Sequence, residues 1–161
     1  MTFRCSAASV PRMETHSHSE AVRAPIRVCF ETLIDFECYP QWFRMITSAR
    51  IEAADAAAGR WTVAYELDAI LKTIRYKLAY ESERPHRLTW KLVDGDLADI
   101  QGNYELIELE PGLTDATCTQ ALELGMWVPG PIRRTFEMSA LADSVREFKQ
   151  AAEARAAARN G

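Results

Sequence analysis

Residues 61–81 read WTVAYELDAILKTIRYKLAYE and contain two stretches in which apolar and polar or small side chains alternate. The apolar members stand two apart within each stretch: Trp61, Val63, Tyr65 and Leu67 in the first, Ile74, Tyr76, Leu78 and Tyr80 in the second. Since successive side chains of a strand point to opposite faces, each stretch predicts a strand with one apolar face. Two adjacent strands of this kind indicate an antiparallel sheet that buries one side.

The period of two extends over residues 51–125, which we expect to form five or six strands. Turn sequences separate them at residues 84–86, 94–96 and 110–112. After the first of these turns, Leu88, Trp90 and Leu92 alternate with polar residues. The last two strands are expected at 97–109 and 115–124, and Gly102 predicts a bulge or sharp bend in the former.

Residues 132–160 contain neither proline nor glycine and predict one long helix. Its apolar residues recur at helical spacing: Ile132, Phe136, Leu141, Val145 and Phe148. We expect the first half of this helix to pack on the apolar face of the sheet and its alanine-rich end to project or fray.

The segment before the sheet predicts three shorter elements. Residues 13–20 alternate weakly and predict an edge strand. Pro25 suits the first position of a helix that stops before Pro40, and residues 41–46 predict a second short helix. We expect residues 1–12 to be a disordered tail and 13–157 to form one ligand-binding domain, with either Met1 or Met13 as the start.

Composition excludes several classes of protein. A net charge of -4 without a basic stripe argues against nucleic acid as a partner. No stretch approaches the roughly 20 apolar residues of a membrane span or forms a secretion signal, so we expect a cytoplasmic protein without stable membrane insertion, although transient membrane contact stays open. The four cysteines form no CxxC pair, which argues against a zinc site or a disulfide framework.

Three strings carry a resemblance to a known family: FETLIDFECYPQWF at 30–43, DGDLADIQGNYEL at 94–106 and VPGPIRRTFEM at 128–138. In their order and spacing they resemble the START-like (SRPBCC) superfamily, in particular its polyketide cyclase/dehydrase and lipid-transport group and the coenzyme-Q-binding relatives. The resemblance spans about residues 13–152. It implies an α+β helix-grip fold, in which a curved antiparallel sheet of six or seven strands wraps around a long C-terminal helix, with two short helices after the first strand.

A single crossing helix does not by itself fill such a sheet, so we expect an apolar cavity between them, although complete packing by the aromatic residues is the alternative. The candidate ligand-binding residues are Trp61, Val63, Tyr65, Leu67, Ile74, Tyr76, Leu78, Tyr80, Trp90, Leu92, Tyr104, Leu122, Phe136, Met138 and Leu141. Asp35, Tyr39 and Trp42 are expected to fix the corner between the short helices, with Asp35 satisfying free backbone donors of the second one.

Catalytic and metal-binding patterns are weak. His16 and His18 share a strand face, but the sequence offers them no third ligand, so we expect no metal and no cofactor. Arg133 and Arg134 fit either a solvated helix end or attraction of an anionic group. No nucleophile stands at a recognisable spacing from a base, so catalytic residues are unknown.

Three functions therefore stay open. The first is binding or transport of a small hydrophobic molecule that is lipid-, quinone- or polyketide-like. The second is a polyketide cyclase, aromatase or dehydratase that uses the same cavity. The third is a protein-interaction or stress-related module with a packed core. The sequence fits either a monomer or a homodimer.

Overall fold

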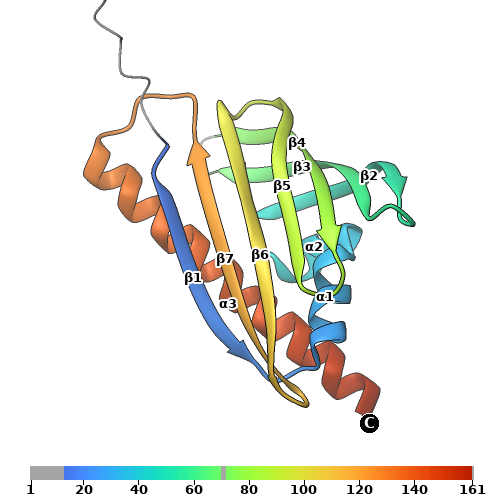
Figure 1. Ribbon diagram of the computed structural model, residues 1–161. Coiled ribbons are helices and arrows are strands. Elements are labelled where there is room, and N and C mark those ends of the chain that lie inside the picture. The colour runs from blue at the N-terminus through green and yellow to red at the C-terminus, as the bar shows by residue number, and fades with distance from the viewer. Residues whose placement is uncertain (1–12, 70–71, 161) are drawn as a thin grey trace, which may run out of the picture.

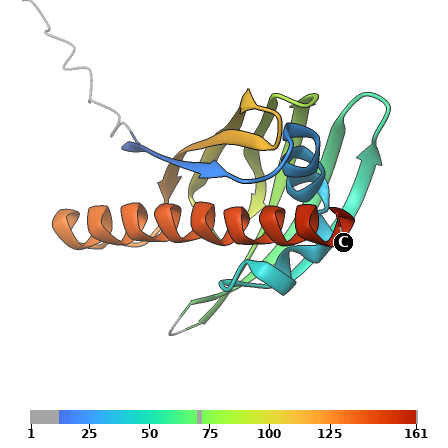
Figure 2. The ribbon, with the colours of Figure 1, turned by 90° about the horizontal axis from the view of Figure 1, so that it is seen from below.

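Seven strands form one antiparallel sheet in the computed structural model, which describes residues 13–69 and 72–160. The strands are β1 (Thr15–Val22), β2 (Ile46–Asp55), β3 (Arg60–Ala69), β4 (Lys72–Glu83), β5 (Arg87–Gly95), β6 (Asp99–Glu110) and β7 (Leu113–Glu123). Their order across the sheet is β1-β7-β6-β5-β4-β3-β2. The sheet curves over the long helix α3 (Gly130–Asn160), as Figures 1 and 2 show. The predicted helix-grip fold is confirmed.

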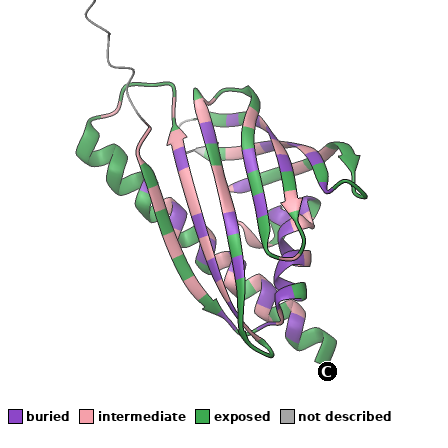
Figure 3. Cartoon of the chain, viewed as in Figure 1, coloured by how far each residue is buried: buried purple, intermediate pink, exposed green. Residues whose placement is uncertain are grey.

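Alternation along the central strands separates a buried face from an exposed one (Figure 3). The register aligns Trp61 of β3 with Tyr80 of β4, Tyr80 with Trp90 of β5, and Trp90 with Gly102 of β6. One row of large rings therefore crosses the inner face of the sheet. Because such rings bury a large apolar area, this row contributes much of the driving force for closing the sheet on α3.

Gly102 leaves room for an aromatic ring rather than forming a bulge. The pairing of β6 with both neighbours is regular at this residue. A Cβ atom at position 102 would lie 2.7 Å from the Trp90 ring and 2.5 Å from the backbone oxygen of Thr119. Of the bulge or sharp bend expected from the sequence, the bulge is absent, and the glycine is required because the Trp90 ring lies directly against the β6 backbone.

Replacing Gly102 with alanine is expected to destabilise the fold by about 1–3 kcal/mol, because neither the indole nor the strand backbone can move without disturbing its neighbours. Denaturant unfolding of both proteins measures the difference. Gly130→Ala is the matched control, because nothing lies within 4 Å of a Cβ atom at that position. Equal stability of Gly102→Ala and the parent protein would contradict this role of Gly102.

The helical corner after β1 is shorter than the sequence predicts. Helix α1 (Ile26–Ile34) ends well before Pro40, and a 3-10 turn (Phe36–Cys38) leads into α2 (Tyr39–Trp42). Pro40 lies in the first turn of α2, where its missing N–H is not needed, so it helps to begin this helix instead of ending the previous one. The second helix predicted at 41–46 is thus misplaced, since Ile46 already begins β2.

Side chains from two directions hold this corner. The Tyr39 hydroxyl donates a hydrogen bond of 2.6 Å to the Leu33 carbonyl oxygen in the last turn of α1. Asp35 does not cap the following helix as expected, because its carboxylate accepts a hydrogen bond from Arg155 on α3. The corner is thereby fastened to the C-terminal part of α3.

Helix α3 packs farther toward its C-terminal end than the sequence predicts. Its first turns are exposed, with Ile132 62% and Met138 53% accessible, whereas Ala152 and Ala156 near its end are buried. The small alanine side chains let α1 approach closely, so the alanine-rich end packs instead of fraying. Leu141, Val145 and Phe148 in the middle are buried against the sheet as predicted.

The remaining boundaries agree with the sequence to within a few residues, except that the sheet resumes at Ile46 and not at Ile51. Strand β1 lies at the sheet edge as expected, paired with β7. None of the described helices is both long and apolar enough to cross a membrane. The tail predicted for residues 1–12 lies outside the described residues.

Candidate ligand-binding site

The sheet and α3 do not fill the space between them. A cavity of about 160 Å³ remains, bounded by the inner face of the sheet, by α2 and by α3. Ten of the residues predicted from the sequence line it: Tyr65, Leu67, Ile74, Tyr76, Leu78, Tyr80, Trp90, Tyr104, Leu122 and Phe136. The core is therefore not completely packed, which was the alternative expectation.

The other five candidate residues lie outside this lining. Trp61, Val63 and Leu141 are buried in the surrounding core, where the Trp61 ring packs edge-on against Phe36 at 5.5 Å. Leu92 is partly buried against the same core, and Met138 is exposed on the outer side of α3. Alternation placed the strand residues on the correct face but could not tell how far along each strand the cavity extends.

Other residues that were not among the predicted ligand-binding residues also line the cavity. These are Tyr39, Trp42, Phe43, Met45, Ile46, Leu97, Ile100, Cys118, Gln120, Leu124, Ala140 and Ser144. Alternation could have found Cys118, Gln120 and Leu124, which share a strand face with Leu122. Helical spacing could have found Ala140 and Ser144, one and two turns after Phe136. Nothing in the sequence marks the contribution of residues 43–46.

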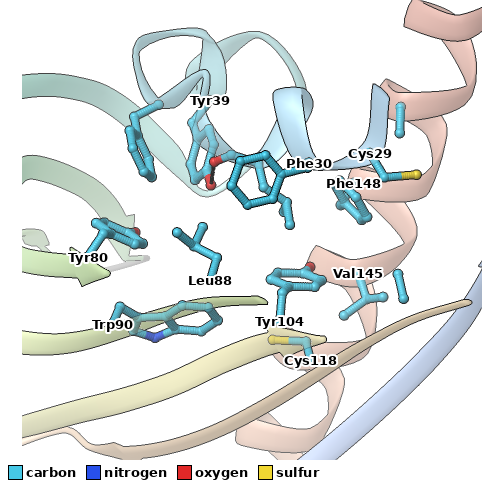
Figure 4. Close-up of a cluster of buried hydrophobic side chains, with 14 of the residues drawn as sticks. Cys29, Phe30, Tyr39, Tyr80, Leu88, Trp90, Tyr104, Cys118, Val145 and Phe148 are labelled. Atoms are coloured by element: carbon cyan, nitrogen blue, oxygen red, sulfur yellow. Dashed lines mark hydrogen bonds between the residues drawn. The ribbon is translucent and has the colours of Figure 1, made fainter. Parts of the chain in front are cut away.

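Seven aromatic rings form a closed circuit around this part of the interior, and Figure 4 shows several of them projecting from the sheet toward the helices. In order they are Tyr39, Trp42, Phe148, Tyr104, Trp90, Tyr80 and Phe36, which returns to Tyr39. Neighbouring centroids lie between 4.4 and 6.2 Å apart. At these distances neighbouring rings support one another, and five of the seven also line the cavity: Tyr39, Trp42, Tyr80, Trp90 and Tyr104.

The polar groups in the lining are few and neutral. The hydroxyls of Tyr65 and Tyr80 share a buried hydrogen bond of 2.8 Å. Burial raises the pKa of Tyr65, Tyr76 and Tyr80 above the ordinary tyrosine value, so these phenols stay protonated at neutral pH. The Trp90 indole N–H is buried without a hydrogen-bond partner among the described residues.

The lining residues that the structure describes carry no group that is charged at neutral pH. Among the described residues that border the cavity there is no Asp, Glu, His, Lys or Arg. The thiol of Cys118 is the strongest potential nucleophile, but burial raises its pKa above the ordinary value, so it stays a thiol. Such a site can exclude water, pack against rings and hydrogen-bond to a neutral ligand.

A curved sheet that grips a helix around an apolar cavity defines a class of small-molecule-binding domains, and the comparisons agree with it. Residues 22–149 match the family described as polyketide cyclase/dehydrase and lipid transport. The chain belongs to this family. A comparison with curated protein sequences found no match.

Solved structures share the fold at low sequence identity. The chain is similar to the protein TTHA0849 from Thermus thermophilus, with 17% identity, a TM-score of 0.76 and coverage of 92% of this chain and 100% of that one. The chain is also similar to the Zhui aromatase/cyclase from Streptomyces sp. R1128, with 16% identity and a TM-score of 0.76. That match covers 93% of this chain and 97% of the other. A START superfamily protein from Mycobacterium smegmatis is 19% identical, with a TM-score of 0.75. That match covers 90% of this chain and 98% of the other.

Proposed function

We propose that this protein binds and carries a small, neutral, ring-containing hydrophobic molecule in the cavity between the sheet and α3. The observation that supports this best is the combination of an aromatic lining, protonated tyrosine hydroxyls and the lack of Asp, Glu, His, Lys and Arg among the described lining residues. The volume of about 160 Å³ is close to that of an apolar cavity of roughly 150 Å³ that takes up benzene.

Neutrality of the ligand follows from the chemistry of the lining. A carboxylate moved into the cavity would lose its hydration and find no cation among the described lining residues, and burying an unpaired charge is strongly unfavourable. A phenol or a quinone-type carbonyl would instead exchange hydrogen bonds with the tyrosine hydroxyls at little cost. The cavity therefore favours quinone-like or phenol-like rings over fatty-acid anions.

Calorimetric titration with p-cresol and p-toluate tests this proposal, because the two compounds share a ring and a methyl group and differ in hydroxyl against carboxylate. We expect p-cresol to bind and p-toluate to bind at least roughly tenfold more weakly, which corresponds to about 1.4 kcal/mol. Equal affinity, or binding of p-toluate alone, would contradict the proposed neutral-ligand site.

A cyclase or aromatase function is the second candidate, and the similarity in fold to the Zhui aromatase/cyclase favours it. In that case the cavity would align the reacting carbons and exclude water, with tyrosine hydroxyls such as Tyr65 and Tyr76 as polar guides. Incubation with a reactive polyketide-type chain, followed by product analysis, distinguishes the two. A cyclised product formed faster than in buffer would favour the enzyme, and unchanged recovery of the bound chain would favour the carrier.

A further inference from the structure

The contact between β1 and α3 is polar, in contrast to the apolar contact that Leu141, Val145 and Phe148 make in the middle of α3. The half-buried face of β1 carries His16, His18 and Glu20. Arg146 on α3 lies 3.6 Å from Glu20, and Glu137 on α3 lies against His16. Charged and imidazole groups thus stand where a core would ordinarily place aliphatic residues.

Three potential metal ligands converge at one end of this contact. The Nε2 atom of His16 lies 3.1 Å from Oε2 of Glu137, although the two residues are 121 positions apart in sequence. Glu14, directly before β1, completes the group, and one ligand atom from each of the three side chains lies within 4.8 Å of the others. The fold therefore supplies the carboxylates that the sequence did not associate with His16.

The environment of Glu137 is a second, independent observation on this group. The residue is only 6% exposed, and its Oε1 atom is buried without a hydrogen-bond partner among the described residues. A buried carboxylate oxygen without a partner is costly, and native structures rarely leave one in this state. A cation seated between Glu137, His16 and Glu14 would satisfy it.

Two arginines of the first turn of α3 lie near the group but do not occupy its centre. Arg133 Nε lies 3.8 Å from Glu137 Oε1, beyond hydrogen-bond distance, and Arg134 Nε lies 3.0 Å from Glu14 Oε1. Their side chains are 46% and 60% exposed. Because both arginine side chains are substantially exposed, either can turn toward solvent and leave its carboxylate to a stronger cation.

We propose that Glu14, His16 and Glu137 bind a divalent transition-metal ion, and Zn²⁺ fits their chemistry best. Imidazole and carboxylate are both zinc ligands, and three protein ligands leave one coordination position for water. Ligand atoms at about 2.0–2.1 Å from tetrahedral Zn²⁺ lie roughly 3.3 Å from each other, close to the 3.1 Å between His16 and Glu137. Mg²⁺ and Ca²⁺ fit less well because they favour all-oxygen sites with six or more ligands.

Such an ion would fasten the exposed beginning of α3 to the edge strand. This group lies beside the cavity. On α3 the cavity is lined by Phe136 and Ala140, which stand one residue before and three residues after Glu137. On β7 it is lined by Gln120, the register partner of His16. Metal binding at this group would therefore stiffen one wall of the cavity. In hydrogen exchange we expect Zn²⁺ to slow the backbone amides of residues 132–140.

Calorimetric titration of the full chain with ZnCl₂ tests the site, with a Cys38→Ser background that removes the half-buried free thiol at that position. We expect one equivalent of Zn²⁺ to bind, and His16→Ala and Glu137→Gln each to weaken binding at least roughly tenfold. His18→Ala is the matched control, because His18 also pairs with a carboxylate, Glu20 at 2.9 Å, but belongs to no such group of three among the described residues.

Circular dichroism of each variant establishes that the fold is retained, and Glu137→Gln preserves the shape of the side chain if His16→Ala proves unstable. Undiminished binding in Glu137→Gln and His16→Ala would overturn the proposed site, as would a larger loss in His18→Ala than in either of them. Absence of binding by the parent protein would overturn it as well. Since the titration requires no organic ligand, its outcome is independent of the carrier function proposed above.

Discussion

Replacing Ala140 with phenylalanine is expected to abolish most ligand binding while leaving the fold intact. Ala140 lines the cavity from α3, between Phe136 one turn before and Ser144 one turn after. A cavity of about 160 Å³ has room for roughly one aromatic ring, so the new side chain and the ligand compete for the same volume. Loss of the burial of a ring, about 1.5–3 kcal/mol, lowers affinity roughly 10- to 100-fold.

Titration of Ala140→Phe with p-cresol measures this loss, and denaturant unfolding measures stability. We expect the free energy of unfolding to stay equal or to rise, because filling an apolar cavity recovers packing. Ser139→Phe is the matched control, since the neighbouring residue is exposed and lies outside the cavity lining. If Ala140→Phe bound p-cresol as tightly as Ser139→Phe, the ligand would not occupy this cavity.

A steep loss of stability above pH 10 is the second large effect that we expect. All five tyrosines of the chain are buried, and burial raises the pKa of each from its ordinary value of 10: Tyr39, Tyr65, Tyr76, Tyr80 and Tyr104. Below pH 10 the hydroxyls are protonated in both the folded and the unfolded state, so they add no pH dependence to the free energy of unfolding. Above pH 10 the unfolded chain releases protons that the folded protein retains.

This difference in proton binding sets the direction of the change in stability. Because the folded state binds more protons, each tyrosine lowers the free energy of unfolding by about 1.4 kcal/mol per pH unit above 10, until the folded hydroxyl itself ionises. Urea unfolding at several pH values between about 9 and 11 measures the slope. Tyr76→Phe should reduce this slope by the contribution of one proton, about 1.4 kcal/mol per pH unit, without breaking the Tyr65–Tyr80 hydrogen bond. Gradual appearance of tyrosinate in a protein that stays folded would contradict the buried tyrosine cluster.

The sequence predicted most of the fold because its strands are strictly patterned. Apolar and polar side chains alternate from Trp61 to Tyr80 over two hydrogen-bonded strands, so one face of the sheet had to be buried. The long helix predicted after the sheet was the element able to cover that face. The errors fall where local pattern and tertiary contact disagree. Pro40 begins a helix, and Ala152 and Ala156 pack closely where polarity suggested a projecting end.

The candidate site was predictable only on the strands. Tyr65, Tyr76 and Leu122 follow from alternation, whereas Tyr39 and Trp42 line the cavity because a helical corner folds back over the sheet. The group around His16 depends on a contact between residues 121 positions apart. No spacing rule relates a strand residue to a helix residue so far along the chain, so only the packing of α3 on β1 brings Glu137 to His16.

Native mass spectrometry of the protein purified from its host, followed by extraction and identification of whatever is bound, shows directly whether the cavity holds a neutral hydrophobic molecule. We expect a neutral, ring-containing apolar adduct that is present in the parent protein and in Ser139→Phe and is lost in Ala140→Phe. A mass without any adduct that stays unchanged after incubation with p-cresol and quinones would contradict it, as would an anionic lipid retained equally by all three proteins.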